Sequence, residues 1–137
     1  MNKDDWGTPE HIYNELDNEF HFTLDPCPFP KPEWDGLEIN WSNERVFVNP
    51  PYSGSNIKLW IEKCFNERNN AEVIVMLIPT TKTGTKYFKK YVLDIGAEIR
   101  FITGRINFTP LAGQNDNSNP LYSLLIVWKP IIVVNDI

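Results

Sequence analysis

The tetrapeptide Asn49-Pro50-Pro51-Tyr52 joins residue types that could bind and activate an amino group on an aromatic ring. The side-chain oxygen of Asn49 and the carbonyl of Pro50 are hydrogen-bond acceptors, and the two prolines lack the amide donors that would compete for them. Two acceptors that hold both hydrogens of an exocyclic amine favour a pyramidal nitrogen with a free lone pair. The Tyr52 ring could stack on the base. The motif is a candidate catalytic site, although Asn-Pro-Pro is also plausible as a surface turn.

An amine activated in this way would accept a methyl group from S-adenosylmethionine, whose sulfonium already carries an activated methyl. Proximity and orientation supply much of the rate of such a transfer, so it needs neither a metal nor a covalent enzyme intermediate. His11 and His21 have no metal-ligand partners in the sequence, and we assign no metal site. The chemistry of the motif therefore predicts an amino-methyltransferase.

Hydrophobic periodicity predicts the elements that must position this motif. Helices are expected over residues 8–20, 56–66 and 86–93, the first with Thr8 as its cap and Pro9 at its first helical position. Strands are expected over residues 22–24, 45–48, 72–78, 98–102 and 121–128. Strands that alternate with helices predict an α/β domain with a largely parallel sheet. No boundary divides residues 1–137, so we expect a single domain.

Ligands of open α/β sheets bind beyond the carboxyl ends of the strands. The expected strand 45–48 ends at Asn49, and the expected strand 72–78 is followed by Lys82 and Lys86. We expect these two lysines to contact phosphate, although a run of lysines is more often a solvated helix face. The segment 109–120 is rich in Gly, Asn, Ser and Asp and is expected to be a mobile loop.

The composition bounds the class of protein. A chain of 137 residues with 42% hydrophobic side chains can bury a core, and no apolar run approaches the roughly 18 residues that span a bilayer. Two cysteines are too few for a disulfide scaffold, so we expect a cytoplasmic protein with free thiols and no membrane partner. Residues 1–50 carry 3 basic and 11 acidic side chains, whereas residues 51–110 carry 9 basic and 5 acidic. One positive surface could therefore face phosphate.

Five ordered segments of the chain resemble the phage-type (Dam-like) DNA N-6-adenine methyltransferases. They are Trp6-Gly7-Thr8-Pro9, Leu24-Asp25-Pro26-Cys27, Asp35-Gly36-Leu37 with Trp41, Asn49-Pro50-Pro51-Tyr52-Ser53, and Gly104-Arg105-Ile106-Asn107-Phe108. The resemblance extends from Trp6 to about Trp128. It implies a reduced Rossmann-like fold that depends on S-adenosylmethionine, with helices on both faces of a largely parallel sheet. It also implies methyl transfer to N6 of adenine in double-stranded DNA, in the host cytoplasm if the gene is phage-encoded.

The resemblance also implies a role for each matching position. The residues expected to bind and activate the adenine are Asn49, Pro50, Pro51 and Tyr52. Those expected to contact the cofactor are Trp6, Thr8, Pro9, Asp25, Cys27, Asp35 and Asn49, with Glu38 as an alternative to Asp35 at the ribose or adenine of the cofactor. Those expected to contact DNA are Lys82, Lys86, Arg105 and Phe108. Trp6 and Cys27 could equally be packing residues, and Arg105 with Phe108 could belong to a structural turn.

One departure from related enzymes concerns the cofactor site. Most methyltransferases follow the first strand with a glycine-rich turn that lets the backbone approach the cofactor. Here Asp25 is followed by a proline-rich segment with no glycine until Gly36. Because ten residues are too few for a helix and a further strand, we expect a loop in place of that part of the fold.

These motifs do not decide between adenine and other substrates, or between an enzyme and a non-catalytic protein. Asn-Pro-Pro-Tyr also occurs in enzymes that methylate cytosine N4, RNA bases or the glutamine side chains of proteins. A non-catalytic protein that binds nucleic acid or cofactor could have kept the fold and lost turnover, and the missing glycine turn favours that reading. The intact tetrapeptide favours an enzyme.

Overall fold

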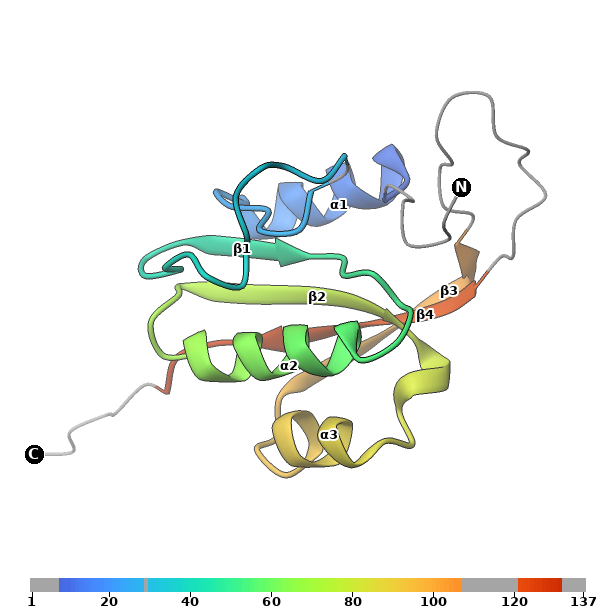
Figure 1. Ribbon diagram of the computed structural model, residues 1–137. Helices are drawn as coiled ribbons and strands as arrows, with labels where there is room; N and C mark the ends of the chain where they lie inside the picture. Colours follow the sequence, from blue (N-terminus) through green and yellow to red (C-terminus); the bar gives the residue numbers. More distant parts are fainter. Residues whose placement is uncertain (1–7, 29, 107–120, 132–137) are drawn as a thin grey trace, which may run out of the picture.

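The core of the protein is a four-stranded sheet, seen in a computed structural model that describes residues 8–28, 30–106 and 121–131 (Figure 1). The strands are β1 (Arg45–Val48), β2 (Val73–Pro79), β3 (Glu98–Ile106) and β4 (Leu121–Trp128). Their order across the sheet is β1-β2-β4-β3. All seven residues of β2 are buried, as expected of a central strand that is covered on both faces.

The sheet is mixed, and the prediction of a largely parallel sheet was wrong. β1 and β2 pair in parallel, but β4 pairs antiparallel with both β2 and β3. A parallel connection needs a crossover of a dozen or more residues, usually a helix. The sequence between β3 and β4 has no helical pattern, so these two strands form an antiparallel pair, and β4 lies between β2 and β3.

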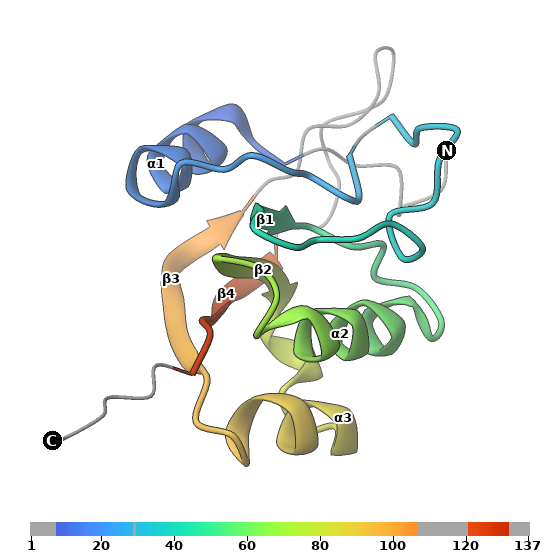
Figure 2. The same ribbon diagram turned by 90° about the vertical axis from the view of Figure 1, so that its left-hand side faces the viewer.

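Helices cover both faces of the sheet, as predicted (Figure 2). On one face lies α1 (Glu10–Phe20), whose Leu16 and Phe20 are four residues apart and therefore share one side of the helix. They pack against Phe47, Val75 and Leu77 of β1 and β2, among others.

The other face is covered by α2 (Asn56–Glu67) and by α3 (Lys86–Phe88), which continues as a π-helical turn over Lys89–Leu93. The buried side chains of α2 recur at helical spacing and are Ile57, Trp60, Ile61 and Cys64. They form one cluster with Phe88, Val92 and the sheet residues of that face. Among the described residues, no helix is long and apolar enough to cross a membrane.

Two local predictions were wrong. The expected strand at 22–24 reduces to a single parallel bridge between Leu24 and Val46. Thr8 does not cap α1, because the cap position is Pro9 and no side-chain oxygen bonds to the first turn. Thr8 instead contacts Asn49, as described below. The other expected strands and helices are present within a few residues of their predicted bounds.

Candidate active site

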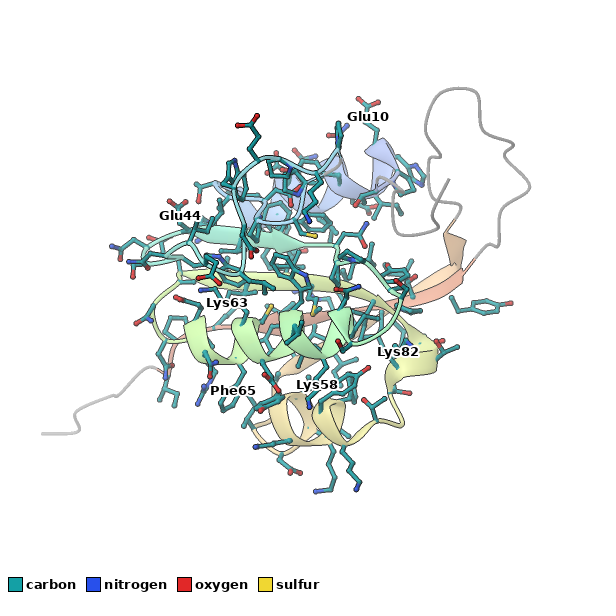
Figure 3. The ribbon with its side chains drawn as sticks, in the orientation of Figure 1. Glu10, Glu44, Lys58, Lys63, Phe65 and Lys82 are labelled. Atoms are coloured by element: carbon teal, nitrogen blue, oxygen red, sulfur yellow. The ribbon has the colours of Figure 1, made fainter. Side chains whose placement is uncertain are left out.

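Three segments leave the sheet at the same edge. β1 and β2 are parallel, and Leu24 bridges Val46 in the same direction. The residues that follow them therefore emerge together, namely Asp25 after the bridge, Asn49 after β1 and Thr80 after β2. The start of α1 lies on the same side of the molecule, since Glu10 and Lys82 are both on the right of the view, at the top and lower down respectively, whereas Glu44 is on the left (Figure 3). Most of the predicted site residues are brought to one place by this topology.

The side-chain amide of Asn49 is held at both ends. Its Nδ2 donates a hydrogen bond of 2.7 Å to Oγ1 of Thr8, and its Oδ1 accepts one of 2.9 Å from the Tyr52 hydroxyl. A carbonyl oxygen has two lone pairs, so the bond from Tyr52 leaves one for a further donor. The arrangement fixes the plane of the carboxamide and keeps an acceptor available at the edge of the sheet.

Tyr52 is a protonated donor within a mostly apolar environment. Its ring packs against the hydrophobic clusters on both faces of the sheet. Burial raises the pKa of the phenol well above its ordinary value, and the proximity of Cys27 raises it further. The hydroxyl therefore keeps its proton near neutral pH, and it can donate a hydrogen bond to Oδ1 of Asn49.

Asp25 carries a partly buried carboxyl group beside this motif. Its Oδ1 accepts a hydrogen bond of 3.1 Å from the backbone N–H of Cys27. Burial raises the pKa of Asp25 to about 6, and the bond from Cys27 only partly offsets that rise. None of the residues that the structure describes forms an ion pair with this carboxylate. A bound cation would therefore stabilise the ionised form of the Asp25 carboxyl group.

Cys27 is a neutral thiol. Burial raises its pKa to about 12, and the Asp25 carboxylate adds to the rise. A thiol that keeps its proton is a poor nucleophile. Cys27 packs against the hydrophobic cluster on the α2 face, which agrees with a packing role.

The loop that replaces the glycine-rich turn is anchored by close packing. A Cβ on Gly36 would lie 1.7 Å from the carbonyl oxygen of Pro26, so the two backbones touch at a place where only glycine fits. The fully buried Trp41 donates from Nε1 to the Gly36 carbonyl over 3.2 Å. Lys63 of α2 donates to the Ile39 carbonyl and lies 5.2 Å from the centre of a Trp41 ring. The segment after Asp25 is thus fixed to α2 without a helix of its own.

Sequence reasoning did not assign these anchoring roles to Gly36, Trp41 and Lys63. The signals available were weak, because a single glycine, tryptophan or lysine in a polar loop has many uses. The strongest of them was the position of Gly36, the first glycine after a proline-rich segment.

The remaining predicted residues are less well placed or lie outside the described ranges. Asp35 and Glu38 are exposed, and Oδ1 of Asp35 accepts from the backbone N–H of Leu37 within a local turn. Trp6 and Phe108 lie outside the described residues, and only the backbone of Arg105 is described, paired with Tyr122 in the sheet.

The two lysines that follow β2 differ in their positions. Lys82 belongs to the short 3-10 helix Thr80–Lys82 directly after β2 and is partly buried (Figure 3). Lys86 begins α3 and is exposed. β4 contacts the 3-10 helix, and Ser123 of β4 pairs with Pro79 at the end of β2. Positive charge is therefore present beside the segment that carries Asn49.

Comparison with known proteins identifies the family. The sequence model of the DNA N-6-adenine-methyltransferase (Dam) family matches residues 1–136. The chain belongs to this family. Its activity is thus adenine-N6 methylation of DNA, and the alternatives on cytosine, RNA and protein are not favoured.

One curated relative supports the assignment. The chain is 26% identical over 141 residues to the DNA N-6-adenine-methyltransferase of Haemophilus phage HP1 (strain HP1c1), an alignment that covers 93% of this chain and 80% of the relative. No solved structure matches the chain. The family and the relative together confirm the phage-type resemblance that the ordered motifs indicated.

Proposed function

We propose that this Dam-family protein transfers a methyl group from S-adenosylmethionine to N6 of adenine in double-stranded DNA, at the sheet edge that carries Asn49, Tyr52 and Asp25. The observation that carries the proposal is the fixed Asn49 carboxamide, with one acceptor lone pair left beside a protonated tyrosine. A mixed sheet with helices on both faces supports a reduced Rossmann-like methyltransferase fold over residues 1–137.

Asn49 and Pro50 hold the adenine amine in this proposal. Oδ1 of Asn49 and the carbonyl of Pro50 accept the two N6 hydrogens, and Pro51 contributes by having no amide hydrogen that could occupy the neighbouring carbonyl. Tyr52 lies against the base, and its hydroxyl keeps Asn49 in place. The nitrogen lone pair is then directed at the methyl donor, and orientation supplies much of the rate.

The described residues fit a cationic cofactor. When bound, S-adenosylmethionine supplies a sulfonium-activated methyl group. Asp25 offers a desolvated carboxylate that has no ion-pair partner among the described residues, which is the chemistry that a cation needs. Pro9, Cys27 and Asp35, together with Trp6 outside the described ranges, are the further residues that we assign to this site.

DNA has to present an extruded base to Asn49. Extrusion from the duplex costs a few kcal/mol, which contacts to the base and the backbone must offset. We assign the backbone contacts to Lys82, Lys86 and Arg105, and a contact with the extruded base to Phe108.

Replacement of Asn49 tests this proposal. Asn49→Ala removes one acceptor for the amine, and methyl transfer should fall by about 100-fold or more, in line with the loss of a positioned group at other active sites. The affinity for S-adenosylmethionine, measured by calorimetry, should stay within a few-fold. Asn70→Ala at the opposite edge is the matched control, because the exposed side chain of Asn70 makes only a long hydrogen bond of 3.4 Å to Glu67.

The readout is mass spectrometry of nucleosides from digested DNA after incubation with enzyme and cofactor. N6-methyldeoxyadenosine is the expected product. Methylation of cytosine instead, or full activity of Asn49→Ala, would contradict the proposal.

A further inference from the structure

Thr8 has a partner that the sequence does not suggest. It stands directly before α1, yet Pro9 occupies the cap position and no side chain caps the helix. Its Oγ1 instead accepts the 2.7 Å hydrogen bond from Nδ2 of Asn49, a residue 41 positions later. Pro9 is buried and ties this segment to the body of the protein. The Thr8 hydroxyl is therefore held against the catalytic motif and does not serve the helix.

The orientation of the Asn49 carboxamide decides which group it offers to a substrate. A carboxamide has two donors on nitrogen and two acceptor lone pairs on oxygen, and rotation by half a turn exchanges them. Only the orientation that presents oxygen can hold an amine hydrogen. In the reverse orientation the NH₂ group would meet the N6 hydrogens and repel them.

Both ends of this carboxamide have partners that suit one orientation. The nitrogen donates to Thr8 and the oxygen accepts from Tyr52. A hydroxyl on either side could in principle accept or donate, but a phenol is the better donor. Tyr52 therefore favours the oxygen at its side, and Thr8 supplies the acceptor that the nitrogen then needs.

We infer that Thr8 is a positioning residue whose hydroxyl keeps the Asn49 carboxamide in the orientation that accepts the adenine amine. This inference rests on the proposed role of Asn49. It differs from the sequence-based expectation that Thr8 contacts the cofactor, because the partner that the structure gives this hydroxyl is Asn49.

Two substitutions at position 8 separate these roles. Thr8→Val keeps the shape of the side chain and removes the hydroxyl, and kcat for DNA methylation should fall by about tenfold with cofactor affinity within twofold. Thr8→Ser restores a hydroxyl and should return kcat to within about threefold of the wild type. If Thr8→Val does not fold, Thr8→Ala against Thr8→Ser gives the same comparison.

Thr23→Val is the matched control. The Thr23 hydroxyl donates to Glu44 and accepts from the backbone N–H of Arg45, at the far end of β1 from Asn49. This substitution removes more hydrogen bonds than Thr8→Val does, so it should lower the melting temperature but leave kcat unchanged.

Three results would overturn the inference. A Thr8→Val enzyme with wild-type kcat and weakened cofactor binding would make Thr8 a cofactor ligand. Unchanged kinetics, or a Thr8→Ser enzyme no better than Thr8→Val, would show that the hydroxyl does not act through Asn49. If Asn49→Ala loses activity while Thr8→Val does not, this inference alone fails. If Asn49→Ala remains active, the proposed function fails first.

Discussion

Asp25 is the residue at the candidate site whose charge changes near physiological pH. Burial raises its pKa to about 6, so the carboxyl is largely protonated below that pH and ionised above it. A cationic cofactor binds the ionised form in preference. The affinity of the protein for the cofactor should therefore depend on pH, and binding of the cofactor near pH 6 should release a proton from Asp25.

We predict that the affinity for S-adenosylmethionine falls as the pH drops through about 6. In Asp25→Asn, affinity should be lower at pH 7.5 and nearly independent of pH between 5 and 7.5. Calorimetry in two buffers with different ionisation enthalpies measures both the affinity and the released proton. A wild-type enzyme with a flat profile over this range would remove Asp25 from the cofactor site.

Asp25 should also lower the stability of the folded protein at neutral pH. The folded protein binds a proton at Asp25 more tightly than the unfolded chain does, so this residue contributes less stability as the pH rises from about 4 through 6. Asp25→Asn should consequently raise the urea midpoint at pH 7.5 while it weakens cofactor binding. Opposite changes in stability and affinity are expected of a residue kept for function.

Among the elements, the loop between Leu24 and β1 depends on one close backbone contact. Gly36 touches Pro26, the residue directly after Asp25, and Trp41 holds the Gly36 carbonyl. The backbone of Gly36 is not in the left-handed region. A side chain is therefore excluded by the neighbouring backbone and not by the conformation of the glycine.

We predict that Gly36→Ala destabilises the protein by about 1–3 kcal/mol, the usual cost of overpacking, because a rigid carbonyl has to move. The displaced Pro26 should also carry Asp25 away and weaken cofactor binding. Gly84→Ala is the matched control, since a Cβ there meets nothing within 4 Å. Urea denaturation measures the first effect and calorimetry the second. Equal urea midpoints for Gly36→Ala and Gly84→Ala would show that a side chain at position 36 does not strain the contact with Pro26.

Across the whole molecule, local pattern predicted the elements better than their arrangement. β1 and β4 have the predicted bounds because each is a short apolar run between polar residues or prolines. The insertion of β4 between β2 and β3 was not predicted, because pairing depends on the faces that the strands bury together.

The candidate site was predicted as a set of residues but not as a set of contacts. The edge that collects Asn49, Tyr52 and Lys82 follows from parallel strands and was expected. The bond between Thr8 and Asn49 joins positions 41 residues apart, and the contact between Gly36 and Pro26 lies within an irregular loop, so regular spacing contains no information about either.

The uneven charge of the molecule determines how DNA can approach it. The first 50 residues are strongly acidic, and the basic side chains of residues 51–110 include Lys82, directly after β2, and Lys86, at the start of α3. A duplex carries a dense line of phosphates that the acidic half repels. Binding at this edge therefore relies on few cations, and its salt dependence should be shallow, in proportion to the few phosphates that are neutralised.

Each lysine that neutralises a phosphate adds about 0.9 to the slope of log K against log salt concentration. We predict that Lys82→Ala and Lys86→Ala each weaken DNA binding at low salt and lower this slope by about 1, whatever the DNA sequence. Lys129→Ala is the control, because Lys129 is exposed directly after Trp128, at the opposite end of the sheet. Fluorescence anisotropy with labelled duplexes from 20 to 200 mM salt, roughly the range over which phosphate contacts are screened, measures the slopes. Since the net charge is −5 in total, an equal loss in all three variants would indicate a general charge effect. A loss of DNA affinity confined to the Lys82 and Lys86 variants would place the duplex over the edge of the sheet where Asn49 is expected to bind the extruded base.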